Sequence, residues 1–424
     1  MRRDTKNLIY IGRRRMPDGD ELSRLAYNEG DPLYILANFD PVEAKFQEWM
    51  DKLDNPIWIA LHNSHIGYII RDENIYHDFL GTKSIARLYK IKQLGLLSGE
   101  DIFIANQTRL DHSLYTPIYM ETVLDSHNFP EEMIHLGIAS AISHDVATPA
   151  LSDQGKLANR NVLDEERNID IILARVEMLE ILEKYGINPE DVAACVRGDY
   201  PIIGELLNSN GVDLDKIAYT ARDTEVFKTS GLSFGEPLAQ LDGFLADDLF
   251  DIHEDIVISD NDIYFMHPER VYNFLMVRGL MFRDVYRNPI HMGREAFIKK
   301  YIEKLWEDGI LTRDNMIIMS DIELLDILKR RLPSDVYAAI TSLVPGDYIK
   351  EEDRISPGDN IPKGDEYATI TSKPFNPATS TMVYTTKGIQ EFRDAYPSEA
   401  GEIESMAKTT GYTGVYKLRK HPGS

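Results

Sequence analysis

Two apolar segments that each carry one histidine dominate the sequence between Thr108 and Asp145. In both segments apolar residues recur at spacings of three and four, which predicts amphipathic helices. The break between them is short, and a short connection makes two neighbouring helices antiparallel. His112 opens the first helix, whereas His144 and Asp145 close the second, so the three side chains lie at the same end of the predicted pair. These residue types at one place indicate a metal site.

The geometry of a helix limits where the ion lies. Neighbouring helical residues point about 100° apart, so His144 and Asp145 reach one ion only if it sits close against the helix end. Asp215, which begins a later helical pattern, is the best candidate for a fourth ligand. Two imidazoles and two carboxylates without a thiolate suit an octahedral ion that keeps exchangeable waters. Closed structural zinc sites usually use cysteine, so we expect a catalytic site.

The charge balance restricts the partners. The chain of 424 residues has 46 Lys and Arg against 70 Asp and Glu, which gives a formal net charge of −24. A surface this acidic disfavours nucleic acid and anionic membranes as general partners. It favours a soluble protein, and a phosphorylated substrate would need a local group of Arg and Lys to reverse the potential at the site.

The location of the protein is predicted from its single cysteine and its short apolar runs. Cys195 excludes an intrachain disulfide framework and fits the reducing cytoplasm; we interpret it as a small buried residue. No apolar run approaches the roughly 18 to 20 residues that span a bilayer. The basic start of the chain has an apolar run too short for a secretory signal, and we expect an extended arm there that a neighbouring subunit orders.

The pattern along the chain predicts a mainly α fold in three parts. In residues 1–80, the runs 32–39, 56–61 and 65–70 read as strands around a helix at 41–53. His62 and His65 there are more typical of surface or turn residues than of a site. Residues 81–345 form a helical domain, with helical periodicity in the ranges 131–144, 164–185, 213–228, 267–287 and 290–308 and with Gly and Pro breaks rather than strands between helices.

The C-terminal part, residues 346–424, is expected to be a linker followed by a small α+β region. The range 344–366 is dense in Pro, Gly and charged residues, as linkers and long loops are. After it, the ranges 366–372, 381–386 and 414–418 read as short strands around a helix-like segment at 388–396. We find no convincing catalytic constellation in this part.

Four motifs in chain order resemble those of the HD-domain phosphohydrolases. They are RLDHSL from Arg109, the His144–Asp145 pair, DKIAYTARD from Asp215 and, shortly before the first histidine, IARLYKIKQLG at 85–95. The last of these is similar to the deoxynucleoside triphosphate triphosphohydrolase branch, which includes the mammalian sterile-alpha-motif/HD enzyme. The resemblance covers about residues 65–330 and implies an HD-domain helical core.

The resemblance also implies roles for single residues. His112, His144, Asp145 and Asp215 would hold a divalent ion (Mn, Fe, Mg, Ni or Zn), and a metal-activated water would attack phosphorus. Cationic side chains would contact the phosphates, and a further set would contact the deoxyribose. The phosphate contacts implied are Arg109, Lys216 and Arg287, and the sugar contacts are Gln93, Leu94, Tyr219 and Asp223.

The sequence departs from the family where the reaction needs a proton donor. The family follows its HD pair with another histidine and then a His-Glu pair on the next helix, whereas this chain has Thr148 and Asp153, then Glu165 and Glu166. A desolvated carboxyl can hold a proton near neutral pH, so Asp153 and Glu166 are the candidate acids. Glu165 and Glu166 equally suit the start of a helix, and His291 or solvent is the alternative donor.

The expected activity is hydrolysis of deoxynucleoside triphosphates to deoxynucleoside and triphosphate by a homo-oligomer in the cytoplasm. The alternatives are a nucleotide phosphatase or phosphodiesterase of the same type and a nucleotide-binding regulatory protein that kept the metal ligands but lost the acid. Product analysis separates them.

Overall fold

The computed structural model describes residues 8–11, 58–60, 67–70, 74–97, 107–229, 249, 251–259, 262–342, 349–355, 364 and 366–418. Within these residues the fold is mainly α with small sheets, which confirms the predicted fold class. The buried apolar side chains form one cluster that extends from Ile75 to Tyr416. Among the described helices none combines the length and hydropathy of a bilayer-spanning segment.

The centre of the molecule is an antiparallel helix pair, α5 (Arg109–Ser126) and α6 (Glu131–Ser143). The pair packs closely because Gly137 faces α5: a Cβ there would lie 2.6 Å from Cδ1 of Leu124 and 2.9 Å from Cγ of Met120. Helix α6 is buried along most of its length, so it forms the core that other helices cover. The start of α5 and the end of α6 lie at the same end of the pair, as the sequence predicts.

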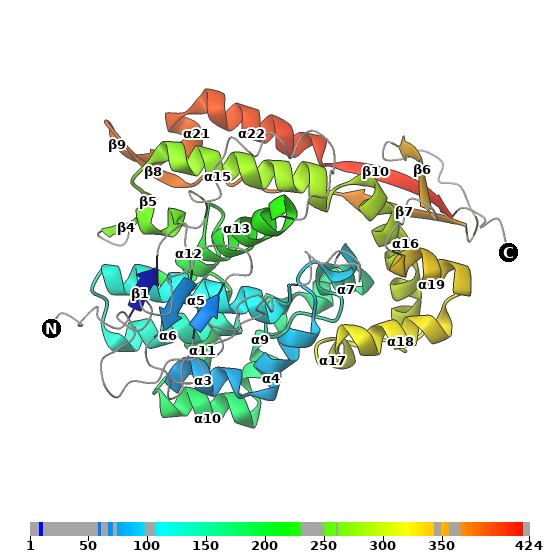
Figure 1. Ribbon diagram of the computed structural model, residues 1–424, viewed down its shortest axis with the longest axis horizontal. Helices are drawn as coiled ribbons and strands as arrows, with labels where there is room; N and C mark the ends of the chain where they lie inside the picture. Colours follow the sequence, from blue (N-terminus) through cyan, green and yellow to red (C-terminus); the bar gives the residue numbers. More distant parts are fainter. Residues whose placement is uncertain are drawn as a thin grey trace, which may run out of the picture.

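Short helices precede this pair and a run of helices follows it (Figure 1). Before the pair come α3 (Asn74–Leu80), α4 (Lys83–Ala86) and the 3₁₀ turns η3 (Arg87–Lys90) and η4 (Gly95–Leu97). After it come α7 (Ser152–Gly155), the 3₁₀ turn η5 (Lys156–Ala158), α8 (Arg160–Leu163), α9 (Glu165–Leu173), α10 (Val176–Lys184), α11 (Pro189–Val196), α12 (Ile203–Leu207) and α13 (Leu214–Thr229). The helix predicted at 164–185 is thus two helices that break at Ala174 and Arg175.

The second half of the helical region contains strands that the periodicity did not predict. Its elements are the 3₁₀ turn η7 (Ile252–Asp255), β4 (Ile256–Ser259), β5 (Asp262–Phe265), α15 (Pro268–Leu280), the π-helical turn η8 (Met281–Tyr286), α16 (Pro289–Glu307), α17 (Arg313–Met316), α18 (Asp321–Arg331) and α19 (Ser334–Thr341). The expectation of helices alone up to residue 345 is wrong at the β4–β5 hairpin. Four-residue strands leave too short an alternation to recognise.

The C-terminal region forms part of two sheets. Its elements are β6 (Ile349–Ile355), β7 (Tyr367–Ser372), β8 (Met382–Thr385), β9 (Gly388–Glu391), α21 (Phe392–Ala395), α22 (Pro397–Thr409) and β10 (Tyr412–Leu418). One sheet has the order β6-β10-β7, and the other, β4-β5-β8-β9, joins the hairpin of the helical region. Helix α22 packs along α15 (Figure 1).

Three C-terminal expectations are corrected in detail. The predicted linker contains β6, which pairs antiparallel with β10. The helix-like segment 388–396 is strand β9 followed by the single turn α21. Helix α22 was not predicted. The strands expected at 366–372, 381–386 and 414–418 are present as β7, β8 and β10. The boundaries of the three predicted parts stay a prediction, although the last two share a sheet and a core.

Before α3, the N-terminal part is described only as a three-stranded antiparallel sheet. Its strands are β1 (Leu8–Ile11), β2 (Trp58–Ala60) and β3 (Gly67–Ile70), in the order β1-β3-β2. The apolar run of the predicted N-terminal arm is therefore a strand paired with β3. The strand expected at 32–39, the helix expected at 41–53, and His62 and His65 lie outside the described residues.

Candidate metal centre and its cavity

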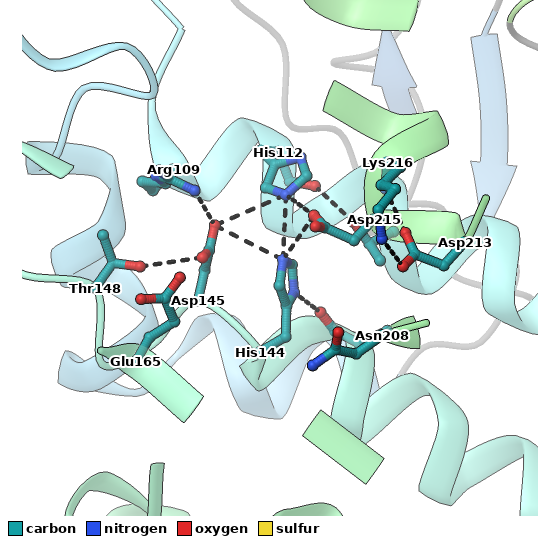
Figure 2. A network of polar contacts seen from close by, with 12 residues as sticks. Arg109, His112, His144, Asp145, Thr148, Glu165, Asn208, Asp213, Asp215 and Lys216 are labelled. Carbon is teal, nitrogen blue, oxygen red and sulfur yellow. Dashed lines mark hydrogen bonds and ion pairs between the residues drawn. The ribbon is translucent and has the colours of Figure 1, made fainter. Parts of the chain in front are cut away.

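The first turn of α5 places two of the predicted site residues. Thr108 is the N-cap: its side chain accepts a hydrogen bond from the backbone N–H of Asp111, and the Asp111 carboxylate accepts from the backbone N–H of Thr108 at 2.7 Å. This capping box fixes where the helix begins. Arg109 and His112, one turn apart, then point from the helix start toward the end of α6 (Figure 2).

His144 directly follows α6, and its ring orientation is set by the backbone. Nδ1 lies 2.6 Å from the carbonyl oxygen of Ala141, which only accepts, so Nδ1–H donates and Nε2 is the atom that carries the lone pair when the ring is neutral. A hydrogen bond of this kind is typical of metal-binding histidines, because it holds the ring and selects the tautomer. Nε2 of His144 faces Nε2 of His112 at 3.1 Å.

Four donor atoms converge between the helix ends (Figure 2). Oδ1 of Asp215, from the first turn of α13, lies 2.8 Å from Nε2 of His112 and 3.4 Å from Nε2 of His144. Oδ2 of Asp145 lies 3.7 Å from both ring nitrogens. The donor atoms of His112, His144 and Asp145 all lie within 4.8 Å of one another, a His-His-Asp cluster that could hold a metal ion.

The electrostatics of the cluster favour a bound cation. Burial by itself lowers the pKa of His144, but Asp145 and Asp215 raise it to about 9. Burial by itself raises the pKa of Asp145, but Arg109 and the two histidines lower it to about 2. Carboxylates that hold a proton on a buried imidazole would also attract a metal ion. The chemistry of this donor set therefore fits a divalent cation, with Asp215 as a fourth ligand in reach.

Two neighbours hold the Asp145 carboxylate in place. Nη1 of Arg109 donates to Oδ2 at 2.8 Å, and the hydroxyl of Thr148 donates to Oδ1 at 3.0 Å. Thr148 stands where the family resemblance places a histidine, and here it supports a candidate ligand instead. Hydrogen bonds of this kind orient a ligating carboxylate.

A cavity of about 780 Å³ opens beside the cluster. Most of the predicted site residues line it, namely Gln93, Leu94, Arg109, His144, Asp145, Asp153, Glu166, Asp215, Tyr219, Asp223 and Arg287. Oε1 of Gln93 and Nε of Arg287 are buried and have no hydrogen-bond partner among the described residues. Buried polar groups are normally hydrogen-bonded, so these atoms mark walls that a polar ligand can use.

The two predicted sugar contacts on α13 are held by other side chains. The hydroxyl of Tyr286 donates to Oδ2 of Asp223 at 2.5 Å, and Nε2 of Gln107 donates to Oδ1 at 3.2 Å. Burial raises the pKa of Asp223 to about 6. Nε of Arg278 donates to the hydroxyl of Tyr219 at 2.7 Å. Contact of Tyr219 and Asp223 with a sugar stays a prediction.

Lys216 does not lie where a phosphate contact in this cavity requires it. Its ammonium donates to Oδ2 of Asp213 and, at 2.8 Å, to the carbonyl oxygen of Ser209, and its side chain is not part of the cavity wall (Figure 2). The residue follows Asp215 on a helix, so the two side chains point about 100° apart. Phosphate contact by Lys216 therefore stays a prediction that this cavity does not support, whereas Arg109 and Arg287 do line the cavity.

The surroundings of Asp153 favour its charged form over the proton donor that the sequence predicted. Its carboxylate is exposed and lies 3.0 Å from Nζ of Lys156 and 3.5 Å from Nη2 of Arg109. Lys156 above all, with Arg109, holds the pKa of Asp153 below its usual range. The expectation that Asp153 is a desolvated carboxyl does not fit this geometry, because its side chain is exposed and its two charged partners are cations.

The other two candidate proton donors, Glu166 and His291, differ in the direction of their pKa shift and in their position relative to the cavity. Burial and Asp164 raise the pKa of Glu166, which lines the cavity and accepts a hydrogen bond from Asn208 at 2.9 Å. The prediction for Glu166 therefore stays open. Burial and Arg294 lower the pKa of His291 to about 3, which favours the neutral imidazole. In addition, His291 does not line the cavity.

The cavity has walls that the sequence did not indicate. Burial raises the pKa of Glu295 on α16 to about 7, and Glu295 lines the cavity with Lys299 and Glu303 of the same helix. A second wall comes from the end of β7 and the residue after it, Ile370 to Lys373, in the part where no site was expected. Lys156, at the start of η5, forms a third wall of the cavity. Helical periodicity could have placed Glu295 one turn from Lys299, but no local pattern could bring β7 here.

Comparisons with known proteins agree with the fold. No protein-family profile matches the chain. The uncharacterised protein YwfO of Bacillus subtilis is 27% identical over 245 residues, 55% of this chain and 53% of that protein, so the match spans about half of its length. Two solved structures, each with a TM-score of 0.63, are a hypothetical protein from Aquifex aeolicus and a phosphohydrolase from Bacteroides thetaiotaomicron. They are 16% and 15% identical and cover 82% and 84% of this chain, and 94% and 98% of their own.

Proposed function

We propose that this chain is a metal-dependent phosphohydrolase that converts deoxynucleoside triphosphates to deoxynucleoside and triphosphate. The observation that carries the proposal is the convergence of His112, His144, Asp145 and Asp215 at the wall of a cavity of about 780 Å³, with Arg109 beside them. A cavity of this size suits a small molecule such as a nucleotide. The fold that the chain shares with a phosphohydrolase supports the same reaction class.

The cluster residues would hold the cation, and Arg109, Gln93 and Asp223 of the cavity wall would hold the substrate. When bound, the cation would lower the pKa of a water molecule and neutralise charge on phosphoryl oxygens. Arg109 presents its guanidinium between Asp145 and the cavity, where its planar group suits phosphate oxygens. Across the cavity, Oε1 of Gln93 and the carboxylate of Asp223 are acceptors for a sugar hydroxyl.

Deoxynucleoside triphosphates are the proposed substrates because the resemblance assigns Gln93, Leu94, Tyr219 and Asp223 to the sugar, and all four line the cavity. One observation favours the alternative of a nucleotide-binding protein with weak activity. The neighbours of Asp153 favour its ionised form and Lys216 donates to Asp213, so two predicted functional groups lack the surroundings that their expected roles need.

The deciding experiment is product analysis on the full-length protein. The protein is incubated with deoxynucleotides and ribonucleotides in the presence of Mn²⁺, Mg²⁺ or Fe²⁺, and products are identified by chromatography and ³¹P NMR. We expect triphosphate and deoxynucleoside. Orthophosphate as the only phosphorus product would instead identify a phosphatase.

A second experiment, the measurement of turnover in two variants, distinguishes an enzyme from a binding protein. Asp145→Ala should abolish turnover, whereas Glu303→Ala, which removes another cavity carboxylate, should leave most of it. A wild type that binds metal and nucleotides but turns over none of them would refute the enzyme and leave the binding protein.

A further inference from the structure

The cavity wall between the metal cluster and α9 contains an unbroken chain of alternating charges. Asp145 is paired with Arg109, Arg109 with Asp153, Asp153 with Lys156, and Lys156 with Glu165, at distances of 2.8, 3.5, 3.0 and 2.6 Å. All five residues line the cavity. This chain of charges connects Asp145, a candidate metal ligand, to Glu165 at the start of α9.

Both cations of this chain of charges, Arg109 and Lys156, have hydrogen-bond donors to spare. Arg109 has five N–H donors, of which one on Nη1 is directed to Asp145, the one on Nε to Ser152 at 2.7 Å and one on Nη2 to Asp153. A lysine ammonium has three N–H donors. Within the described residues, Lys156 uses two of them, for Asp153 and Glu165. The third is available to a ligand in the cavity.

The position of Lys156 is fixed by the backbone before it. The side chain is only 10% exposed. Gly155 packs so closely on the carbonyl oxygen of Ala150 that a Cβ would not fit there. Glycine therefore lets the chain fold back and carry Lys156 into the wall. A cation fixed in this way needs little reorganisation when an anion binds.

We propose that Lys156 is a phosphate-binding residue of this site, and that Asp153 and Glu165 position its ammonium group. The inference rests on the proposed function, because it assigns a further phosphate contact to the same cavity. It gives the cavity a cation three residues after Asp153, which stands where the family resemblance places a histidine. The two carboxylates then act through Lys156 and not as proton donors.

The charge of Lys156 is permanent at neutral pH. Burial by itself lowers the pKa of the ammonium group, but Asp153 and Glu165 raise it above its usual value. A lysine that keeps its proton stabilises negative charge on phosphate oxygens and does not act as a general acid.

The test is the binding of inorganic phosphate to the full-length, Mn²⁺-loaded protein by calorimetry. Lys156→Met removes the charge and keeps the length of the side chain, and we expect the Kd to rise about 10- to 100-fold, the usual effect of losing one charge-assisted hydrogen bond. Lys156→Arg should stay within a few-fold of wild type. Lys184→Met removes a lysine that pairs with Asp78 and does not line the cavity, and it should leave the Kd unchanged.

Two results of the phosphate titration would overturn the role of Lys156. Equal Kd values for wild type and Lys156→Met, at equal metal content, would overturn the proposal, as would a wild type that binds no phosphate. If Lys156→Met does not fold, Lys156→Gln decides: its amide can still donate to Asp153 and Glu165 but carries no charge, so the Kd should again rise about 10-fold, and an unchanged Kd refutes the role.

Failure of the proposed function gives a different result. In that case the protein hydrolyses no nucleotide, yet its phosphate affinity still depends on Lys156. Conversely, nucleotide hydrolysis that is equally fast, with equal KM, in wild type and in Lys156→Met would remove Lys156 from the site and keep the proposed function.

Discussion

Asp145 connects the metal cluster to the cavity, because one oxygen faces the two histidines and also accepts from Arg109. We expect the purified protein to hold about one divalent metal ion per chain, through the mixed nitrogen and oxygen donor set of the cluster. Asp145→Ala should lose most of it, because two neutral imidazoles and one carboxylate leave the ion undercharged. Elemental analysis measures this, with Glu303→Ala as the variant that removes a cavity carboxylate outside the cluster. Unchanged metal content in Asp145→Ala would contradict the assignment.

Glu295 predicts a pH dependence of stability. Burial, opposed by Arg287, raises its pKa to about 7, from a usual value near 4.5. The folded protein therefore binds this proton more tightly than the unfolded chain does. The resulting stabilisation is complete below about pH 4.5 and is lost as the pH rises through 7. Glu295→Gln cannot ionise, so its Tm relative to wild type should be higher at pH 8 than at pH 5.

The control for Glu295 is Glu303→Gln on the same helix, which removes a carboxylate that is paired with Lys299. Both variants are followed by thermal denaturation between pH 5 and pH 8. If the difference in Tm between Glu295→Gln and wild type does not change over this range, the carboxyl of Glu295 does not titrate as described.

At the scale of elements, the start of α5 determines the site, because its capping box fixes the turn that carries Arg109 and His112. Thr108→Ala removes the cap and should cost about 1 kcal/mol of unfolding free energy. The first turn should then fray, which weakens metal binding as well. Denaturant titration measures the first effect and metal titration the second.

Asn188→Ala is the matched control, since Asn188 caps α11, a helix that contributes to the cavity only at its last residue, Val196. It should cost a similar free energy and leave the metal affinity unchanged. Equal loss of metal affinity in the two variants would show that general destabilisation, and not the start of α5, is responsible.

At the scale of the whole molecule, the C-terminal sheet is packed on α16 and completes the cavity through β7. The contact is closest at Gly293, where a Cβ would lie 2.7 Å from Cγ2 of Ile349 and 2.8 Å from Cδ1 of Tyr416. Gly293→Ala gains about 1 kcal/mol of helix propensity, but overpacking typically costs about 1 to 3 kcal/mol. We expect net destabilisation together with weaker substrate binding.

Gly401 in α22 offers the comparison, because a Cβ there meets nothing within 4 Å. Gly401→Ala should therefore stabilise the protein by about 0.5 to 1 kcal/mol, measured by the same denaturant titration. A Gly293→Ala variant as stable as Gly401→Ala would show that α16 and the C-terminal sheet are not tightly packed.

The sequence by itself determined the main helices and the meeting of four donor side chains. Apolar spacing of three and four is a local property, so the ranges of α5, α6, α13 and α16 followed from it. The short break between α5 and α6 then required an antiparallel pair, which brings His112 to His144. Asp215 followed from its place at the start of a later helix, and its approach to both histidines has been found.

The tertiary structure alone decided what surrounds those donors. Lys216 turns to Asp213, Asp153 pairs with Lys156, and β7 closes a wall from about 150 residues beyond α13. Periodicity states which face of an element is buried, but it does not state which distant charge or strand will face it. Those choices depend on loop paths and strand pairing, such as that of β5 with β8, whose partners are remote in sequence. The ion pairs of the cavity therefore became visible only in three dimensions.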